Sequence, residues 1–223
     1  MENKKSICFV ATVDFAVNNF LLNHLRELSN HYNLTLVTNL QNPNFLNKNN
    51  LNIKLININF SRNINIFSDF YSLTRLIFLF CTNKFDAVHS ITPKAGLLAM
   101  LAAFIAFIPL RIHCFTGQVW VTRKGLIRKI LRLIDKLIGN LTTKNIVDSK
   151  SQFHFLLKHK ILKKNKTLVF GSGSICGVDL LKFKSNKKIR DSLRRDFKIP
   201  SSAFIYIYLG RLNKEKGVND LID

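Results

Sequence analysis

The sequence predicts an α/β fold built on a doubly wound parallel sheet. Short apolar runs typical of buried strands alternate along the chain with longer segments of helical periodicity. Apolar residues make up 47% of the 223 residues, which excludes a mainly disordered chain despite a formal net charge of +21. Because parallel strands are joined by crossover connections, this alternation favours helices packed on the faces of one sheet.

The elements follow from these two periodicities. Residues 7–13 (ICFVATV) are apolar throughout and predict a fully buried strand, whereas residues 51–60 (LNIKLININF) alternate and predict a half-exposed strand. Helices are predicted where apolar residues recur three or four positions apart. In chain order, the predicted strands are 7–13, 33–38, 51–60, 86–90, 110–116, 145–148, 167–170 and 202–209, and the predicted helices are 15–32, 67–80, 95–107, 125–141, 149–159 and a last one from residue 218.

Neither a membrane span nor a disulfide framework is predicted. The longest apolar stretch, residues 96–109, has fourteen residues, and a spanning helix needs about 20. Lys4 and Lys5 precede an apolar run, but Asp14 interrupts that run too early for a signal peptide. The four cysteines lack metal-ligand spacing and fit a reducing cytosol.

The positive charge raises the question of two partners, nucleic acid and an anionic membrane. The 34 Lys and Arg residues are spread along the chain without a zinc-finger, zipper or RNP-like pattern, which disfavours nucleic acid. The predicted helix 125–141 is amphipathic, with Arg128, Arg132 and Lys136 along one face. Such a helix could lie on an anionic membrane, or it could be a core-packed helix with a solvated face.

Ligand sites on a doubly wound sheet lie beyond the carboxyl ends of the strands. The candidate site therefore lies in the loops after Val13, Ser90, Thr116, Asp148 and Phe170. The sequence has no GxGxxG or Walker motif and no GxSxG elbow, so a standard dinucleotide site, a P-loop and an α/β-hydrolase nucleophile are not supported.

The end of the chain predicts a second domain. A strand over 202–209 is followed by a charged loop and by a helix whose second turn is the last of the sequence. One strand with half a helix cannot bury itself. We therefore expect an amino-terminal domain over residues 1–170, an interdomain linker over 171–200 and the truncated start of a second domain over 201–223.

Four segments resemble the bacterial family-4 glycosyltransferases. They are SITPKAG (90–96), FTGQVW (115–120), GSGSICGVD (171–179) and the pairs Gly210-Arg211 and Lys216-Gly217. The resemblance implies the amino-terminal, Rossmann-like acceptor domain of a two-domain GT-B enzyme. It further implies retaining transfer, without a metal or cofactor, from a nucleotide-diphosphate sugar to a lipid-linked acceptor. Such enzymes build lipopolysaccharide, capsule or glycoprotein glycans as peripheral proteins on the inner face of the cytoplasmic membrane.

The resemblance assigns Arg211 and Lys216 to the donor diphosphate. Charge builds on that leaving group, and fixed cations between a strand end and a helix start would neutralise it. The alternative is two exposed charges on a helix-entry loop. The family's pair of acidic residues, seven apart in the second domain, has no counterpart in this chain, so the chain alone is expected to transfer little sugar.

The acceptor side is predicted from the turn after residue 115. Thr116, Gly117, Gln118 and the lone Trp120 could line an acceptor cleft, because an indole packs well on a sugar face. The alternative is a structural turn with a core tryptophan. Many family members carry His-Gly at this turn, whereas His113 is expected to point into the core. No catalytic residue is therefore assigned.

Further candidates lie at neighbouring strand ends. Thr92 and Lys94 open a helix, where Lys94 could hold an acceptor phosphate or simply be an exposed lysine on a proline-started helix. Asp14 ends the first strand and faces the same cleft in the family. Asp148 with Ser149 could equally be a helix cap, and Asp135 is expected to pair with a nearby arginine.

The glycine-rich segment is predicted to border the cleft and join the domains. Gly171, Gly173 and Gly177 permit a flexible linker or a close backbone approach to a ligand, and Asp179 follows them. A different function class remains open: a non-catalytic module that binds anionic membrane or a glycan lipid. Tight binding of nucleic acid at physiological salt is disfavoured.

Overall fold

The computed structural model describes residues 4–42, 44–61, 65–210, 212 and 216–222. The chain divides into two compact units, Met1–Gly177 and Val178–Asp223, and each is described by itself. The division falls inside the segment predicted as a linker. None of the helices in the described ranges is long and apolar enough to cross a membrane.

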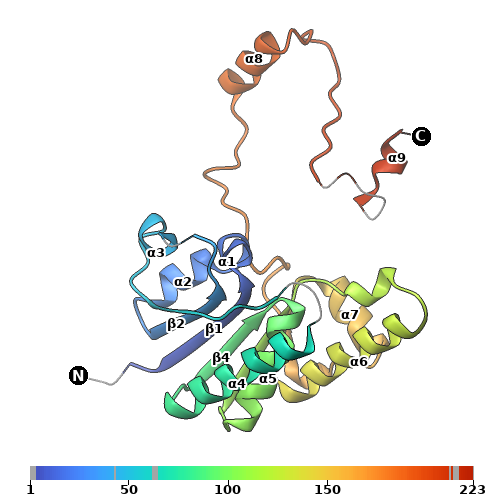
Figure 1. Cartoon of the computed structure of the whole chain (residues 1–223). Helices are drawn as coiled ribbons and strands as arrows, with labels where there is room; N and C mark the ends of the chain where they lie inside the picture. Colours follow the sequence, from blue (N-terminus) through green and yellow to red (C-terminus); the bar gives the residue numbers. More distant parts are fainter. Residues whose placement is uncertain (1–3, 43, 62–64, 211, 213–215, 223) are drawn as a thin grey trace. The chain divides into compact units, whose positions relative to one another are not determined.

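The first unit holds a seven-stranded sheet in which every strand is parallel to its neighbours (Figure 1). The spatial order is β3-β2-β1-β4-β5-β6-β7, so the order reverses between β1 and β4. The predicted doubly wound parallel sheet is therefore confirmed. The strands are β1 (Ser6–Val13), β2 (Asn33–Asn39), β3 (Lys54–Asn57), β4 (Ala87–Ile91), β5 (Leu110–Phe115), β6 (Lys144–Val147) and β7 (Thr167–Val169).

Two apolar clusters cover the two faces of this sheet. One cluster joins alternate residues of β1, β4 and β5 to the helices α4 to α7, and the other joins the intervening residues to α1, α2 and α3. The helices of the first unit are α1 (Asp14–Phe20), α2 (Leu22–Leu28), α3 (Phe45–Lys48), α4 (Ile66–Thr82), α5 (Pro93–Ile105), α6 (Gly125–Leu141) and α7 (Lys150–Lys158), with 3₁₀ turns η1 (Val119–Thr122) and η2 (Lys164–Lys166).

Two elements of the first unit differ from their predictions. The helix predicted over 15–32 is two helices, α1 and α2, which end at Leu28. They meet at Leu21, whose φ of −119° departs from that of a regular helix and whose side chain is fully buried. The strand predicted over 51–60 is only β3, four residues long. Leu51, Ile58 and Phe60 flank β3 in loops, and their side chains are buried. The alternation of apolar and polar residues therefore reflects side-chain burial and not a longer strand.

The second unit contains α8 (Lys187–Asp196) and α9 (Val218–Ile222). The strand predicted over 202–209 is wrong: residues 203–209 have no regular structure, and Tyr206, Ile207 and Leu209 are more than four-fifths exposed. A strand needs a neighbouring strand for its backbone hydrogen bonds, and the described part of this unit supplies none. The α8 helix was not predicted.

Candidate active-site edge

The carboxyl ends of β1 and β4 meet where the strand order reverses, which is the usual ligand site of such sheets. Thr92, between β4 and α5, has φ +76°, which is strained for a β-branched residue. Its Oγ1 lies 2.6 Å from Thr12 Oγ1 and accepts a 3.3 Å hydrogen bond from the Thr12 backbone N–H. The strain therefore holds a hydroxyl pair at the switch point.

Asp14 follows Thr12 by two residues, and its carboxylate makes hydrogen bonds within the protein. Its carboxylate is buried, and Oδ2 accepts hydrogen bonds from the backbone N–H groups of Gln41 (3.2 Å) and Asn42 (3.1 Å). Asp14 therefore holds the loop after β2 against the end of β1. A contact between Asp14 and an acceptor stays a prediction.

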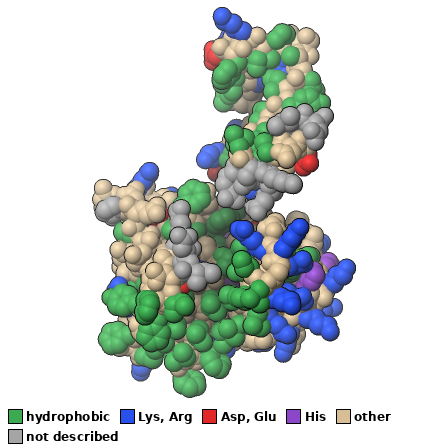
Figure 2. Space-filling model, turned by 45° about the vertical axis from the view of Figure 1, so that its right-hand side comes forward, with side chains coloured by type: hydrophobic (Ala, Val, Ile, Leu, Met, Phe, Trp, Pro, Cys, Tyr) green, Lys and Arg blue, Asp and Glu red, His purple; other side chains and the backbone are tan. Residues whose placement is uncertain are grey.

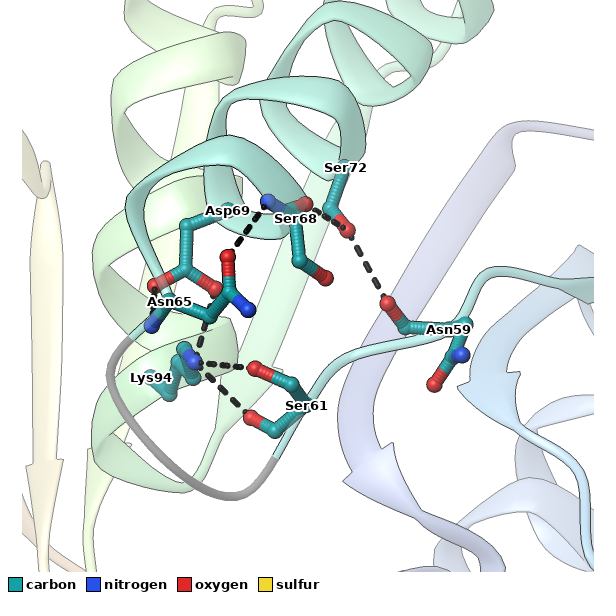
Figure 3. Close-up of polar contacts among 7 residues, drawn as sticks. All are labelled: Asn59, Ser61, Asn65, Ser68, Asp69, Ser72 and Lys94. Atoms are coloured by element: carbon teal, nitrogen blue, oxygen red, sulfur yellow. Dashed lines mark hydrogen bonds and ion pairs between the residues drawn. The ribbon is translucent and has the colours of Figure 1, made fainter.

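Lys94 is the centre of a polar cluster at the start of α5 (Figure 3). Its Nζ lies 2.7 Å from Asp69 Oδ1 of α4 and donates to the backbone oxygen (2.8 Å) and Oγ (2.9 Å) of Ser61. The lysine and aspartate side chains are each about one-fifth exposed. A phosphate at Lys94 would have to compete with this carboxylate, so phosphate binding stays a prediction.

The same cluster fixes the first turn of α4 (Figure 3). The Asn65 side chain caps the helix by accepting from the Ser68 backbone N–H (3.1 Å), and the Asn65 N–H donates to Asp69 Oδ2 (3.3 Å). Ser72 Oγ donates to the Asn59 carbonyl (3.0 Å). The loop before α4 is thus fastened to both α4 and α5 at the carboxyl-end edge of the sheet.

The turn after β5 presents the polar groups predicted for the acceptor side. Gly117 is exposed, and a Cβ added there would meet no atom within 4 Å, so packing does not require glycine. Thr116 and Gln118 are half-buried. Gln118 Nε2 is shielded from solvent and has no hydrogen-bond partner among the described residues.

Trp120 does not line a cleft, so that prediction is wrong. The indole is 1% exposed, stacks on Phe155 of α7 at 5.4 Å, and donates a 2.8 Å hydrogen bond from Nε1 to Asp135 Oδ2. The guanidinium groups of Arg128 and Arg132 each lie 5.9 Å from the indole ring. Trp120 is therefore a core tryptophan after a structural turn, which is the alternative that the sequence left open.

The partner predicted for Asp135 is also corrected. Asp135 accepts from the Trp120 indole and forms no ion pair with an arginine within the described ranges. Burial raises the pKa of Asp135 to about 6, and the Trp120 hydrogen bond opposes that rise. An arginine partner would lower the pKa of this carboxyl, whereas burial beside the indole raises it.

His113 points into the core, as predicted. Its Nδ1 lies 2.8 Å from Ser90 Oγ on the neighbouring strand, and burial lowers the pKa of the imidazole to about 3. Gly96 of α5 packs against this ring so closely that a Cβ there would lie 2.3 Å from Cε1 of His113. His113 is therefore a neutral residue of the core, and it does not serve as a general base at the turn after β5.

The glycine-rich segment covers the carboxyl end of β6. Asp148 accepts from the backbone N–H of Ser174 at its carbonyl (2.7 Å) and from that of Ile175 at Oδ1 (2.8 Å). Gly173 has φ +113°, and a Cβ there would lie 2.5 Å from the Asp148 carbonyl oxygen. His24 Nε2 of α2 lies 2.6 Å from the Ile175 carbonyl. This segment is thus a fixed part of the first unit up to Gly177.

The remaining candidates have simpler environments. Ser149 caps α7 by accepting from the Gln152 N–H (3.0 Å), so the cap is Ser149 and Asp148 binds the glycine-rich segment instead. Gly171 has φ +52° and open space around it. Asp179 belongs to the second unit, where Oδ1 accepts from the backbone N–H groups of Leu181 and Lys182.

The predicted donor clamp has no described geometry. Lys216 is exposed, and its carbonyl accepts from the Tyr208 hydroxyl (3.3 Å). Arg211 lies outside the described residues. Diphosphate binding by this pair stays a prediction. Sequence reasoning also missed Thr12, whose only signal was its place next to the end of a buried strand.

Comparison with known proteins gives a consistent picture. No family model matches the chain. Over 162 residues it is 37% identical to the capsular polysaccharide biosynthesis glycosyltransferase CapM of Staphylococcus aureus, covering 72% of this chain and 42% of CapM. Over 156 residues it is 26% identical to the Escherichia coli UDP-Gal:alpha-D-GlcNAc-diphosphoundecaprenol alpha-1,3-galactosyltransferase, covering 70% and 39%. These homologues are glycosyltransferases. The chain spans about two-fifths of their length.

Solved structures agree on the fold. The S. aureus MnaA–UDP co-structure matches with a TM-score of 0.61 at 16% identity, over 88% of this chain and 52% of MnaA. At that identity the match concerns the fold alone. The seven-stranded parallel sheet is therefore of the Rossmann-like kind found in GT-B-like enzymes, as the sequence predicted.

Proposed function

We propose that this chain is the acceptor-side part of a retaining glycosyltransferase of family 4 that acts in surface glycan synthesis. The donor would be a nucleotide-diphosphate sugar and the acceptor a lipid-linked sugar, at the inner face of the cytoplasmic membrane. The 37% identity to CapM over 72% of the chain carries the proposal. The galactosyltransferase supports a lipid-linked acceptor through the GlcNAc-diphosphoundecaprenol in its name, and the UDP of the MnaA structure supports a nucleotide donor.

The acceptor would bind at the carboxyl-end edge of the sheet. There the unpartnered Gln118 amide would donate to a hydroxyl or phosphate oxygen of the acceptor, and the Thr116 hydroxyl lies two residues away. The Thr12–Thr92 pair would present a rigid hydroxyl surface at the switch point. Arg211 and Lys216 would neutralise the leaving diphosphate, and we propose that no metal takes part.

Acceptor binding tests this proposal directly. The chain is titrated in detergent with GlcNAc-diphosphoundecaprenol and, separately, with undecaprenyl monophosphate, and binding is followed by calorimetry. We expect saturable binding of the glycan lipid, weakened by about tenfold or more in Gln118→Ala, which removes one hydrogen bond to a charged group. The control is Asn30→Ala, which removes an exposed side-chain amide just before β2, at the opposite, amino-end edge of the sheet. Equal affinity for both lipids, or equal loss in both variants, would contradict the proposal.

Transfer is the second readout. We propose that the 223 residues alone transfer little sugar, because they match about two-fifths of the relatives' length. Incubation with a panel of nucleotide sugars and the same acceptor should give product close to the enzyme-free blank. Turnover well above the blank would refute this part.

A non-catalytic binding module is the second candidate. The basic side chains Arg128, Lys129, Arg132 and Lys136 are all exposed along α6, which favours an anionic surface as partner. Salt-sensitive vesicle binding without recognition of the glycan lipid would support this reading over the transferase.

A further inference from the structure

Positive charge alone does not mark a binding site in this protein. Figure 2 shows Lys and Arg side chains spread over the surface, with few acidic side chains among them. One cavity of the first unit joins such charge to a hollow of about 710 Å³, which is within the size range of small-molecule sites. It is formed around the amino ends of β1, β2 and β3 and the last turn of α4, and we call it the amino-end pocket.

The amino-end pocket lies at the opposite edge of the sheet from the candidate acceptor turn. Its strand residues come from the start of each strand, whereas Thr92 and Gln118 follow strand ends. β1 has eight residues, so roughly 25 Å separates the two edges. A small ligand in this pocket is therefore a different ligand from any bound at the turn after β5.

Strand register builds the floor of the pocket. Ser6 of β1 pairs with Asn33 of β2, and Thr35 of β2 pairs with Lys54 of β3. Ser6, Thr35 and Lys54 lie on the face of the sheet that α4 covers, because the residues two positions further along each strand pack in the cluster that includes α4. Thr82 ends α4 and also lines the pocket, so the sheet and this helix together form its walls.

Three lysines from separate segments supply the charge of the pocket. Lys4 precedes β1, Lys54 begins β3 and Lys84 precedes β4, and all three are exposed. None of them forms an ion pair with a described residue, and Lys4 Nζ donates to a neutral backbone carbonyl (2.8 Å). No described residue that lines the pocket is acidic, and the carboxylate of Asp86 accepts from the Ser6 N–H (2.8 Å). An anion would therefore relieve the repulsion among these lysines.

The neutral groups of the pocket indicate a saccharide rather than a bare anion. The side-chain amides of Asn33, Asn52 and Asn83 belong to the same lining as the lysines, and amides of this kind can both donate to and accept from sugar hydroxyls. Tyr32 is half-buried in this lining, and an aromatic ring packs well on the face of a sugar.

The placement of the lysines indicates a ligand with several charges. β2 and β1 separate β3 from β4 in the sheet, so the starts of β3 and β4, which carry Lys54 and follow Lys84, are roughly 14 Å apart across the strands. Carboxylates spaced along an oligosaccharide match this spread of charge better than one phosphate does. We propose that the amino-end pocket binds an acidic oligosaccharide, with the lysines meeting its carboxylates and the amides and Tyr32 meeting its sugar rings. This second saccharide site goes beyond the proposed function and does not require sugar transfer.

Calorimetry with three probes tests the inference. The full 223-residue chain is titrated with trigalacturonate, with neutral maltotriose and with inorganic pyrophosphate, each in about 0.1 M salt. We expect saturable binding of trigalacturonate. Each other probe should bind at least about tenfold more weakly, because maltotriose lacks the charges and pyrophosphate lacks the sugar rings.

Paired lysine variants separate the pocket from general positive charge. Lys54→Gln with Lys84→Gln should weaken trigalacturonate binding by about tenfold or more, since two charge-assisted contacts are lost. The control pair Lys187→Gln with Lys188→Gln removes two exposed lysines of α8 in the second unit. We expect the control pair to change the affinity by less than about twofold. The emission of the lone, buried Trp120 reports whether each variant keeps its fold.

Asn52→Ala tests the saccharide part of the inference. The Asn52 side chain is exposed, so its removal leaves the core unchanged. We expect this variant to bind trigalacturonate about threefold or more weakly, because a hydrogen bond to a sugar hydroxyl is lost, and to bind pyrophosphate as the parent does.

Four results would overturn the inference. They are the absence of saturable trigalacturonate binding, equally tight binding of maltotriose, equally tight binding of pyrophosphate, and equal loss in the two lysine pairs. Gln118→Ala, at the other edge of the sheet, should leave trigalacturonate binding intact. Failed recognition of the glycan lipid with intact trigalacturonate binding would refute the proposed function alone, and the reverse would refute the amino-end pocket alone.

Discussion

Gly96→Ala probes a close contact between helix α5 and strand β5. Gly96 lies inside α5, and a Cβ added there would lie 2.3 Å from Cε1 and 2.7 Å from Nδ1 of His113. The imidazole is 2% exposed and bonded to Ser90 Oγ. The ring has no room to retreat in a close-packed core, so the helix or the ring must shift.

The expected magnitude comes from three opposing contributions. Alanine in place of glycine inside a helix ordinarily stabilises by about 1 kcal/mol. Overpacking a core costs about 1–3 kcal/mol, and breaking the buried bond between His113 and Ser90 costs about 1–3 kcal/mol. We therefore expect Gly96→Ala to lower the free energy of unfolding by about 2–3 kcal/mol, opposite in sign to the usual effect of this substitution.

Urea unfolding followed by the fluorescence of Trp120 measures this change. Gly117→Ala is the control, because its added Cβ meets no atom within 4 Å, and we expect a change within about 0.5 kcal/mol. In a His113→Ala background the clash is gone, so adding Gly96→Ala should then be neutral or stabilising. A Gly96→Ala protein as stable as the parent, or an equal cost in both backgrounds, would refute the steric argument.

Three further predictions concern polar contacts of the first unit. Burial raises the pKa of Asp135 from 3.8 to about 6, so the protonated carboxyl stabilises the fold below the unfolded pKa and this stabilisation is lost as pH rises through about 6. We expect the free energy of unfolding from urea titrations to fall by about 3 kcal/mol between acid and neutral pH for this reason. Asp135→Asn should remove that pH dependence. Gly173→Ala places a Cβ 2.5 Å from the Asp148 carbonyl and should speed hydrogen exchange of amides 174 and 175 at least about tenfold; unchanged rates would argue against it. Lys94→Met leaves the Asp69 carboxylate without its cation and should lower the free energy of unfolding in urea by about 1–3 kcal/mol. The double variant Lys94→Met/Asp69→Leu should recover part of that loss.

Local pattern was sufficient for most of the first unit. The helix predicted over 125–141 has those bounds in α6, and the apolar runs at 7–13 and 33–38 became the adjacent strands β1 and β2. Hydrophobic pattern works here because α6 buries one side against the sheet, whereas β1 and β2 lie within the sheet and are buried on both faces. It misled at 202–209, where strand propensity alone cannot supply the backbone partners of a strand.

The candidate site was predicted less completely. Position at a strand end placed Thr92, Thr116 and Gln118 at the carboxyl-end edge of the sheet, because the carboxyl ends of parallel strands all lie there. Residue type misled for Trp120, since an indole suits a sugar face and a core equally well. The indole of Trp120 donates a hydrogen bond to the buried carboxylate of Asp135 on α6, and this contact places the ring in the core.

The sequence by itself determined the order and type of most elements of the first unit, and with them the parallel sheet and the edge that carries the candidate site, since these depend on periodicities read within each segment. Only the tertiary structure decided which polar groups meet: Thr12 with Thr92, Lys94 with Asp69, and Asp148 with the glycine-rich segment. Such pairs join residues far apart in the chain, and their geometry depends on how packed elements are placed against one another, which no local pattern encodes.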